Sequence, residues 1–156
     1  MKILVLAIGK TDLKWIDEGV NIYKNRISHY LPFESKVIPN IKKTKHTSII
    51  KQKKLEADLI LKTIKDSDKI ILLDEKGEDL SSIDFSKLIQ KNMNLSCKRL
   101  IFIIGGSYGF SDKFYSKNFP KIRLSKMTFS HQMIRPFFLE QIYRACTIIK
   151  NESYHH

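Results

Sequence analysis

Short apolar runs alternate along this chain with longer segments in which apolar residues recur at helical spacing. Segments with strand character lie at residues 3–8, 33–38, 69–73, 99–104 and 121–124, and residues 3–8 form a continuous apolar run. Continuous apolar runs of this length are typical of strands buried on both faces, and strands that alternate with helices predict a parallel sheet. We therefore expect an α/β fold, with a mostly parallel sheet flanked by helices. Segment 99–104 is expected to be the central strand, and segment 33–38, between Pro32 and Pro39, an edge strand.

Helical spacing predicts where the helices begin and which sides they bury. The first long helix should begin at about Leu13, and a short one should span 112–117. Strand 69–73 should end in the turn-rich sequence DEKGEDL, after which Ser81 or Ser82 caps a helix that buries Ile83, Leu88 and Ile89. The last helix should begin between Gln132 and Pro136 and bury one side, made of Ile134, Phe137, Phe138, Ile142 and Ala145.

The length of 156 residues suits one domain, spanning 1–156, with a sizeable core. No apolar run approaches the roughly 18 residues that a membrane span needs, and the N-terminus does not resemble a signal peptide. We expect a cytoplasmic protein that does not enter a membrane. Cys97 and Cys146 are too few for a disulfide framework or a zinc site, so both should be packed as small apolar residues.

Positive charge dominates the composition, with 28 Lys and Arg against 16 Asp and Glu, a net charge of +12. A lysine bias of the genome is one explanation, but clustering favours a polyanionic partner such as nucleic acid. Eight lysines and only two acids lie between Pro39 and Lys65. The segment Lys42–Lys54 is expected to be a basic loop that contacts phosphates without reading sequence, followed by a helix with Leu55, Leu59, Ile60 and Ile64.

Two adjoining loops near the C-terminus are the strongest candidates for a binding site. One is the glycine-rich turn Gly105–Gly109 after the central strand, and the other is the polar segment Ser125–Gln132. Ligands of open α/β sheets bind at the carboxyl ends of the strands, so we expect the two loops to form one pocket. The turn is not a dinucleotide-binding fingerprint, and the chain contains no phosphate-binding loop, no nucleophile elbow and no metal-ligand spacing.

Three charged or titratable residues flank the second loop. His131 could be catalytic, but a partly buried structural histidine is at least as plausible. Arg135 and Arg144 are nine residues apart, which puts them on roughly opposite faces of a helix. Arg144 could equally form an ion pair with Glu140 one turn earlier.

The chain resembles the RlmH family of SPOUT-superfamily methyltransferases. The motifs are IGGSYG, LSKMTFSHQMIR, LEQIYRA and the C-terminal Tyr154-His155-His156, together with ILVLAIGK at the start and LLDEKG after the third strand. The resemblance implies an S-adenosylmethionine-dependent enzyme that methylates N3 of a pseudouridine in 23S ribosomal RNA of the large subunit, on assembled ribosomes. It also implies a homodimer and a deep C-terminal trefoil knot. The alternative is a non-catalytic ribosome- or RNA-binding protein that retains the fold.

Position by position, the resemblance assigns the cofactor site to two single residues and one run. They are Leu73, Gly105 and the run Leu124, Ser125, Lys126, Met127, Thr128 and Phe129. Backbone groups of tight loops can bind an adenine edge, while apolar side chains line the pocket. The acceptor nitrogen must lose its proton, so a base or nearby cations would help. The candidates are His131, Arg135, Arg144, Tyr154 and His155, of which the tail residues rank first for placing RNA in the partner's site.

Three positions depart from the family pattern. Ser130 stands where a proline is usual, Pro136 where an aliphatic residue is usual, and His156 where a lysine or arginine is common. A proline is tolerated in the first turn of a helix but kinks it further along. A terminal histidine should weaken one phosphate contact at neutral pH.

Overall fold

The computed structural model of the chain describes residues 1–39 and 48–156. Ten elements follow one another within these two ranges: β1 (Lys2–Ile8), α1 (Lys14–Ser28), β2 (Phe33–Ile38), α2 (Ile49–Leu61), β3 (Lys69–Asp79), α3 (Ser82–Asn94), β4 (Arg99–Ile104), α4 (Asp112–Tyr115), β5 (Lys121–Arg123) and α5 (Ile134–Ile149). All strand pairings are parallel, and the strand order is β2-β1-β4-β3-β5. The predicted α/β fold, the central β4 and the edge position of β2 are confirmed.

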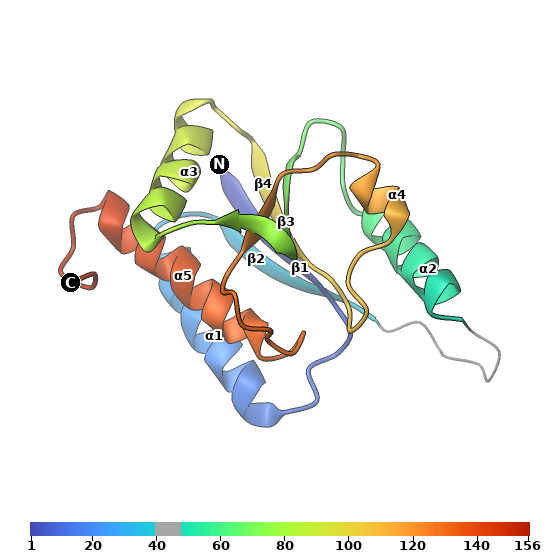
Figure 1. Cartoon of the computed structure of the whole chain (residues 1–156). Coiled ribbons are helices and arrows are strands. Elements are labelled where there is room, and N and C mark those ends of the chain that lie inside the picture. The colour runs from blue at the N-terminus through green and yellow to red at the C-terminus, as the bar shows by residue number, and fades with distance from the viewer. Residues whose placement is uncertain (40–47) are drawn as a thin grey trace.

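Helices cover both faces of the sheet (Figure 1). On one face α1, α3 and α5 pack together, and on the other α2 lies beside α4. Side chains alternate along each strand, so Ile3, Val5 and Ala7 of β1 join the first core while Leu4, Leu6 and Ile8 join the second. Both faces of β1 are therefore buried, which explains its unbroken apolar run.

The first core contains the C-terminal helix. Phe138 of α5 packs between Phe85 of α3 and Phe102 of β4, with ring centroids 5.8 and 5.0 Å away. Ile142 and Ala145, one and two turns along, are fully buried in the same core. This packing fixes α5 on the sheet and therefore fixes the loop that precedes it.

Strand β3 differs from the prediction because it continues past Leu73 to Asp79. Its pairing with β5 shifts register, so Ile122 lies opposite Leu73 and again opposite Glu78. The residues between Leu73 and Glu78 do not pair with β5, and the pairing of β3 with β5 resumes at Glu78 and Asp79. The polar second part of β3 is therefore a strand because it pairs with β5 at the sheet edge. A pattern of apolar residues could not predict this pairing.

Three helical predictions also need correction. Helix α2 begins at Ile49, where the Ser48 hydroxyl accepts a hydrogen bond from the Lys51 amide at 3.2 Å, so the second half of the expected basic loop is helical. Residues 40–47, the first part of that loop, lie outside the described residues. Ile83 and Phe137 are 47% and 46% exposed, because each lies at the margin of its helix's buried side.

Helix α2 ends at Leu61, before Ile64, and α4 ends at Tyr115, short of the expected residue 117, whereas the remaining helix boundaries agree with expectation. Ser81 caps α3 by accepting a hydrogen bond from the Asp84 amide at 3.1 Å. Helix α5 begins at Ile134, so Pro136 lies in its first turn, where no backbone hydrogen bond is lost. Cys97 and Cys146 are buried as expected. Within residues 1–39 and 48–156, no helix has the length and apolar character to cross a membrane.

Candidate functional site

A cleft of about 920 Å³ lies at the carboxyl ends of β4 and β5 and beside the middle of β3, whose Leu73, Asp74, Glu75 and Lys76 line it. Its walls are the glycine turn after β4 and the loop between β5 and α5, which are the two loops that the sequence indicated. The structure brings together here every residue that the resemblance assigned to the cofactor: Leu73, Gly105, Leu124, Ser125, Lys126, Met127, Thr128 and Phe129. The expected composite pocket is present.

Backbone conformation shapes the glycine turn. The Gly109 amide donates to the Gly106 carbonyl at 3.0 Å, which closes the turn. Gly109 has a φ of +69°, a left-handed conformation that side chains disfavour. Glycines at 105, 106 and 109 leave the main chain accessible from the cleft, so its peptide groups are available to a ligand.

Side chains at its two ends fix the second loop. The Ser125 hydroxyl accepts from the Met127 amide at 2.9 Å, and the Ser130 hydroxyl accepts from the Met133 amide at 3.1 Å. The Gln132 amide group donates to Asp12 at 2.8 Å and accepts from the Asp12 backbone at 2.9 Å. Ser130 thus caps the approach to α5, which gives a physical role to the residue that replaces the usual proline. Met127, at the tip, is 79% exposed.

His131 joins the two walls of the cleft. Its Nδ1 lies 3.3 Å from the Ser107 hydroxyl of the glycine turn. Burial, followed by the positive charge of Arg135, lowers the pKa of His131 from its ordinary 6.5, while Asp12 and Glu56 oppose the shift. The imidazole is therefore neutral at pH 7 and can accept a proton within the cleft.

Arg135 lies behind the cleft and does not line it. It is 4% exposed, and its guanidinium donates to the carbonyls of Ile8 at 2.8 Å and His131 at 3.0 Å and to the Thr11 hydroxyl at 2.9 Å. Burial lowers the pKa of Arg135. An arginine with these partners links the end of β1 to the start of α5, which is a structural position.

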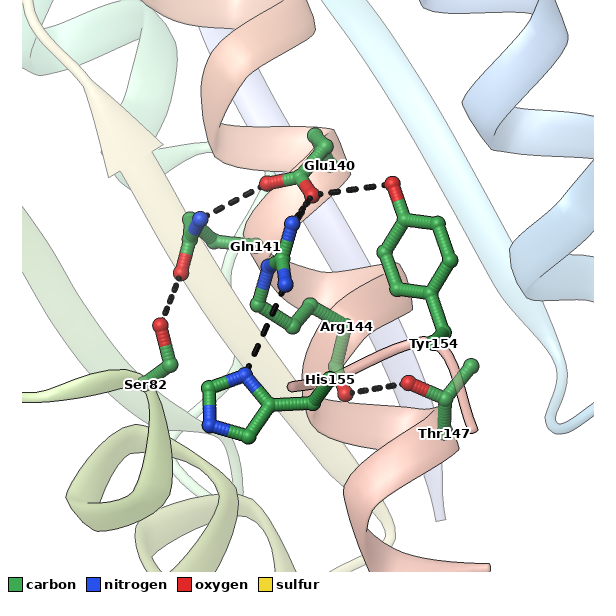
Figure 2. A network of polar contacts seen from close by, with 7 residues as sticks. All are labelled: Ser82, Glu140, Gln141, Arg144, Thr147, Tyr154 and His155. Carbon is green, nitrogen blue, oxygen red and sulfur yellow. Dashed lines mark hydrogen bonds and ion pairs between the residues drawn. The ribbon is translucent and has the colours of Figure 1, made fainter. Parts of the chain in front are cut away.

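Arg144, Tyr154 and His155 gather further along α5, outside the cleft of their own chain (Figure 2). Glu140 is the centre of this group, since it accepts from Arg144 at 2.6 Å and from the Tyr154 hydroxyl at 3.1 Å. The expected ion pair of Arg144 with Glu140 is confirmed. Nδ1 of His155 lies 3.5 Å from Arg144, and the Arg144 guanidinium stacks 4.7 Å from the Tyr154 ring centroid.

These contacts order the C-terminal tail. Burial, followed by hydrogen bonding with Tyr23 and with Glu140, raises the pKa of Tyr154 to about 12, so its hydroxyl keeps its proton. Tyr30 donates to Glu152 at 2.5 Å, which ties the tail to the end of α1. Arg144 lies beside this tail and pairs with Glu140, whereas Arg135 is buried behind the cleft and donates to Ile8. The two arginines lie in separate environments, as their spacing predicted.

Sequence reasoning missed one polar pair on the cleft wall. The Tyr115 hydroxyl donates to Asp74 at 2.6 Å, and both residues line the cleft. Burial, followed by this hydrogen bond, raises the pKa of Tyr115. Asp74 directly follows Leu73 at the end of an apolar run, and that position was the available signal. In the part of the chain that the structure describes, no group of three His, Cys, Asp or Glu residues could hold a metal ion.

Comparison with known proteins identifies the family. A family model described as "Predicted SPOUT methyltransferase" matches residues 1–155. This chain belongs to the SPOUT methyltransferase family. This is the superfamily that the sequence motifs indicated. The matched range includes the loops that form both walls of the cleft.

Curated relatives of this SPOUT chain are similar over its full length. Proteins named ribosomal RNA large subunit methyltransferase H from Parabacteroides distasonis and Christiangramia forsetii are each 54% identical over 156 residues, covering 100% of this chain and 99% of the relative. The protein of that name from Cytophaga hutchinsonii is also 54% identical, with both chains fully covered. A probable methylase family protein from Haemophilus influenzae, 8% identical, covers 99% of this chain and 70% of its own with a TM-score of 0.51, a likeness of fold alone.

Proposed function

We propose that this protein is an S-adenosylmethionine-dependent methyltransferase that methylates N3 of a pseudouridine in 23S ribosomal RNA of the large subunit, on assembled ribosomes. Relatives that share about half of its residues are named as large-subunit ribosomal RNA methyltransferases. The observation that carries the proposal is the single cleft that contains all eight residues expected to bind the cofactor.

The chemical character of the cleft fits this cofactor. Leu73, Leu124 and Phe129 supply an apolar lining for an adenine ring, and the peptide groups of the two loops supply hydrogen-bond partners for its edge. Gly105, without a side chain, lets the main chain approach the ribose or the methionine part. When bound, S-adenosylmethionine supplies a methyl group that its sulfonium already activates, so the protein contributes mainly alignment.

His131 is the candidate base within the cleft. The acceptor nitrogen forms a bond to the methyl carbon as the sulfur–carbon bond breaks, and its proton must leave. A neutral imidazole whose Nδ1 contacts Ser107 is available to take that proton. Arg135 supports the loop from behind through its hydrogen bond to the His131 carbonyl.

The ordered tail suggests how a second chain would take part. Arg144, Tyr154 and His155 lie away from the cleft of their own chain, so we assign them to the cleft of a partner in a homodimer, where they place the RNA. We further propose that residues 1–156 form one domain in the cytoplasm, and that its C-terminal part is threaded as a deep trefoil knot.

Methyl transfer to ribosomes tests the proposal directly. Purified protein and radiolabelled S-adenosylmethionine are incubated with ribosomes from a strain lacking this gene, and the 23S RNA is digested and examined by mass spectrometry. One methyl group on one pseudouridine is expected. Binding of the cofactor, seen by calorimetry, without transfer to any ribosomal particle would favour a non-catalytic RNA-binding protein.

The tail assignment has its own test. His155→Ala, and a chain that ends at Ser153, should lose turnover while keeping cofactor affinity, because neither change touches the cleft of the same chain. Removal of His156 alone is the matched control. Unchanged turnover in the first two variants would contradict the assignment.

Substrate choice should depend on the surroundings of the target nucleotide. A short isolated stem-loop should be methylated far less efficiently than an assembled ribosome, since contacts to phosphates do not discriminate sequence. Efficient methylation of the isolated stem-loop would contradict this.

A further inference from the structure

Two polar side chains are buried on the inner side of α2, where apolar residues are expected. Gln52 and Glu56 are 7% and 4% exposed, and the Gln52 amide group donates to Glu56 at 2.8 Å. Their neighbours on this side, Ala57 and Ile60, are apolar. Burying a carboxylate costs free energy, and the packing of α2 on the sheet does not require a carboxylate at this position. The position of Glu56 therefore indicates another role.

The Glu56 carboxylate lies directly against the glycine turn. A Cβ atom at position 106 would lie 2.9 and 3.3 Å from its two oxygens, and 3.3 Å from a methyl group of Ile8. The φ of Gly106 is not positive, so backbone conformation does not demand glycine there. A side chain at this position would meet the carboxylate, which would have to move to make room for it.

The opposite side of the same turn faces the cleft. Gly106 and Ser107 line it, and the Ser107 hydroxyl contacts His131 of the second loop at 3.3 Å. Glu56 therefore lies behind the glycine turn, and the turn contacts His131 of the second loop through Ser107. Its negative charge also raises the pKa of His131, together with Asp12 and against burial and Arg135.

We infer that Glu56 is a positioning residue for the methyl-donor site: its side chain supports the glycine turn from behind and fixes the distance between the two walls of the cleft. The inference rests on the proposed function, because it assigns a role to a residue that supports the cofactor's cleft without lining it. Helix α2 thereby becomes part of the binding apparatus.

A double-mutant cycle tests this role through cofactor affinity. Calorimetry with S-adenosylmethionine measures the dissociation constant of Glu56→Ala, of Gly106→Ala and of the double variant. Each single change should weaken binding about tenfold, by removing the support or by pushing the turn forward. The double variant should bind more tightly than Gly106→Ala alone, because the new methyl group occupies the vacated space.

Controls separate this role from general stability. Asp58→Ala changes another carboxylate on α2, whose Oδ1 accepts from Lys113 of α4 at 2.7 Å, and should leave affinity within about twofold. Glu56→Gln keeps the size of the side chain, so it folds even if Glu56→Ala does not, and it should fail to rescue Gly106→Ala. Three outcomes would overturn the inference. The first is wild-type cofactor affinity in Glu56→Ala, and the second is a double variant whose loss of affinity equals the product of the two single losses. The third is recovery of cofactor affinity in Gly106→Ala when Glu56→Gln is added.

A second readout needs no cofactor. Glu56→Gln should shift the amide resonances of Gly106 and Ser107 and lower the pKa of His131 in NMR titrations, whereas Asp58→Asn should do neither. Failure of the wild-type protein to bind S-adenosylmethionine would count against the proposed function, and this measurement would still decide the contact of Glu56 with the turn. Unchanged resonances and an unchanged His131 pKa would overturn it.

Discussion

His131 and Arg135, four residues apart at the start of α5, lie in different surroundings and have different roles. His131 faces the cleft and is kept neutral, while Arg135, one turn later, is buried and makes three hydrogen bonds. A guanidinium remains charged even when burial disfavours its charge, so its partners must stay in place. Arg135 is therefore an anchor, and its contribution should appear in stability.

Replacement of Arg135 by methionine tests this anchor. Arg135→Met leaves the carbonyls of Ile8 and His131 without their partner, so the free energy of unfolding should fall by about 3 kcal/mol. Urea denaturation at fixed protein concentration measures the change. Lys150→Met, at the exposed end of α5, should stay within about 0.5 kcal/mol of wild type, and an equally small effect of Arg135→Met would disprove the anchoring role.

The ion pair of Asp68 with Arg99 should make stability depend on pH. Hydrogen bonds from Arg99 and from the Lys65 amide lower the pKa of Asp68 from its ordinary 3.8. A carboxyl group with a depressed pKa stabilises the fold above its unfolded value and loses that contribution as the pH falls below it. Asp68→Asn should cost about 1–3 kcal/mol at pH 7 and progressively less below pH 4. Unfolding curves from pH 7 to 3 measure this, and a cost independent of pH would contradict it.

At the scale of elements, the pairing of β3 with β5 determines the floor of the cleft. Strand β5 has only three residues, and Ile122 lies opposite β3 at two positions. Leu73, which pairs with Ile122, and Leu124, which directly follows β5, both line the cleft. The shape of the cleft therefore depends on how closely the two strands approach.

Gly77 permits that approach. A Cβ atom there would lie 2.3 Å from the backbone carbon of Ile122, so Gly77→Ala must move β5 away from β3. We expect a loss of about 1–3 kcal/mol in the free energy of unfolding together with weaker cofactor binding. Gly19→Ala is the matched control, because its Cβ would meet only Pro136, at 3.3 Å, in a helix that favours alanine. Wild-type cofactor affinity in Gly77→Ala would show that the cleft does not depend on this contact.

Element order was predictable because each strand and helix has its own pattern of apolar residues. The first part of β3, residues 69–73, was found by its apolar run, whereas its second part consists of polar residues that pair only because β5 lies beside them. Ile83 has helical spacing but lies at the margin of α3, a distinction that depends on neighbouring elements. Local patterns thus predict elements, and tertiary contacts set their limits.

The site was predictable to the extent that it consists of loops next to strands. The glycine turn and the segment at 124–132 were found by their position after apolar runs. Glu56 was not, because it lies about 50 residues before the turn that it contacts, within a helix that was predicted only from its apolar residues. A buried carboxylate cannot be distinguished from an exposed one by sequence spacing.

For the whole molecule, the net charge of +12 should govern its encounter with RNA. Lys53, Lys76 and Lys126 line the cleft, so part of this charge surrounds the proposed reaction site. Cations that contact phosphates release counterions, which makes binding depend steeply on salt. Cofactor binding, which involves few charges, should not share this dependence.

A salt titration measures the difference. Affinity for ribosomes should fall about tenfold or more between about 50 and 200 mM KCl, while the dissociation constant for S-adenosylmethionine changes by less than about twofold. Replacing Lys53, Lys76 and Lys126 together by glutamine should flatten the salt dependence for ribosomes. An unaltered slope in the triple variant would mean that other cations bind the RNA.

The place of β5 in the chain has a consequence for how the protein is made. Four strands and the whole second core come from the residues before Pro120, but the α5 side of the first core and the second wall of the cleft come from the chain after β5. Domains generally fold as units during synthesis. A growing polypeptide would thus complete its first core and the proposed methyl-donor pocket together, once α5 has been made, so a chain cut short before α5 would have neither.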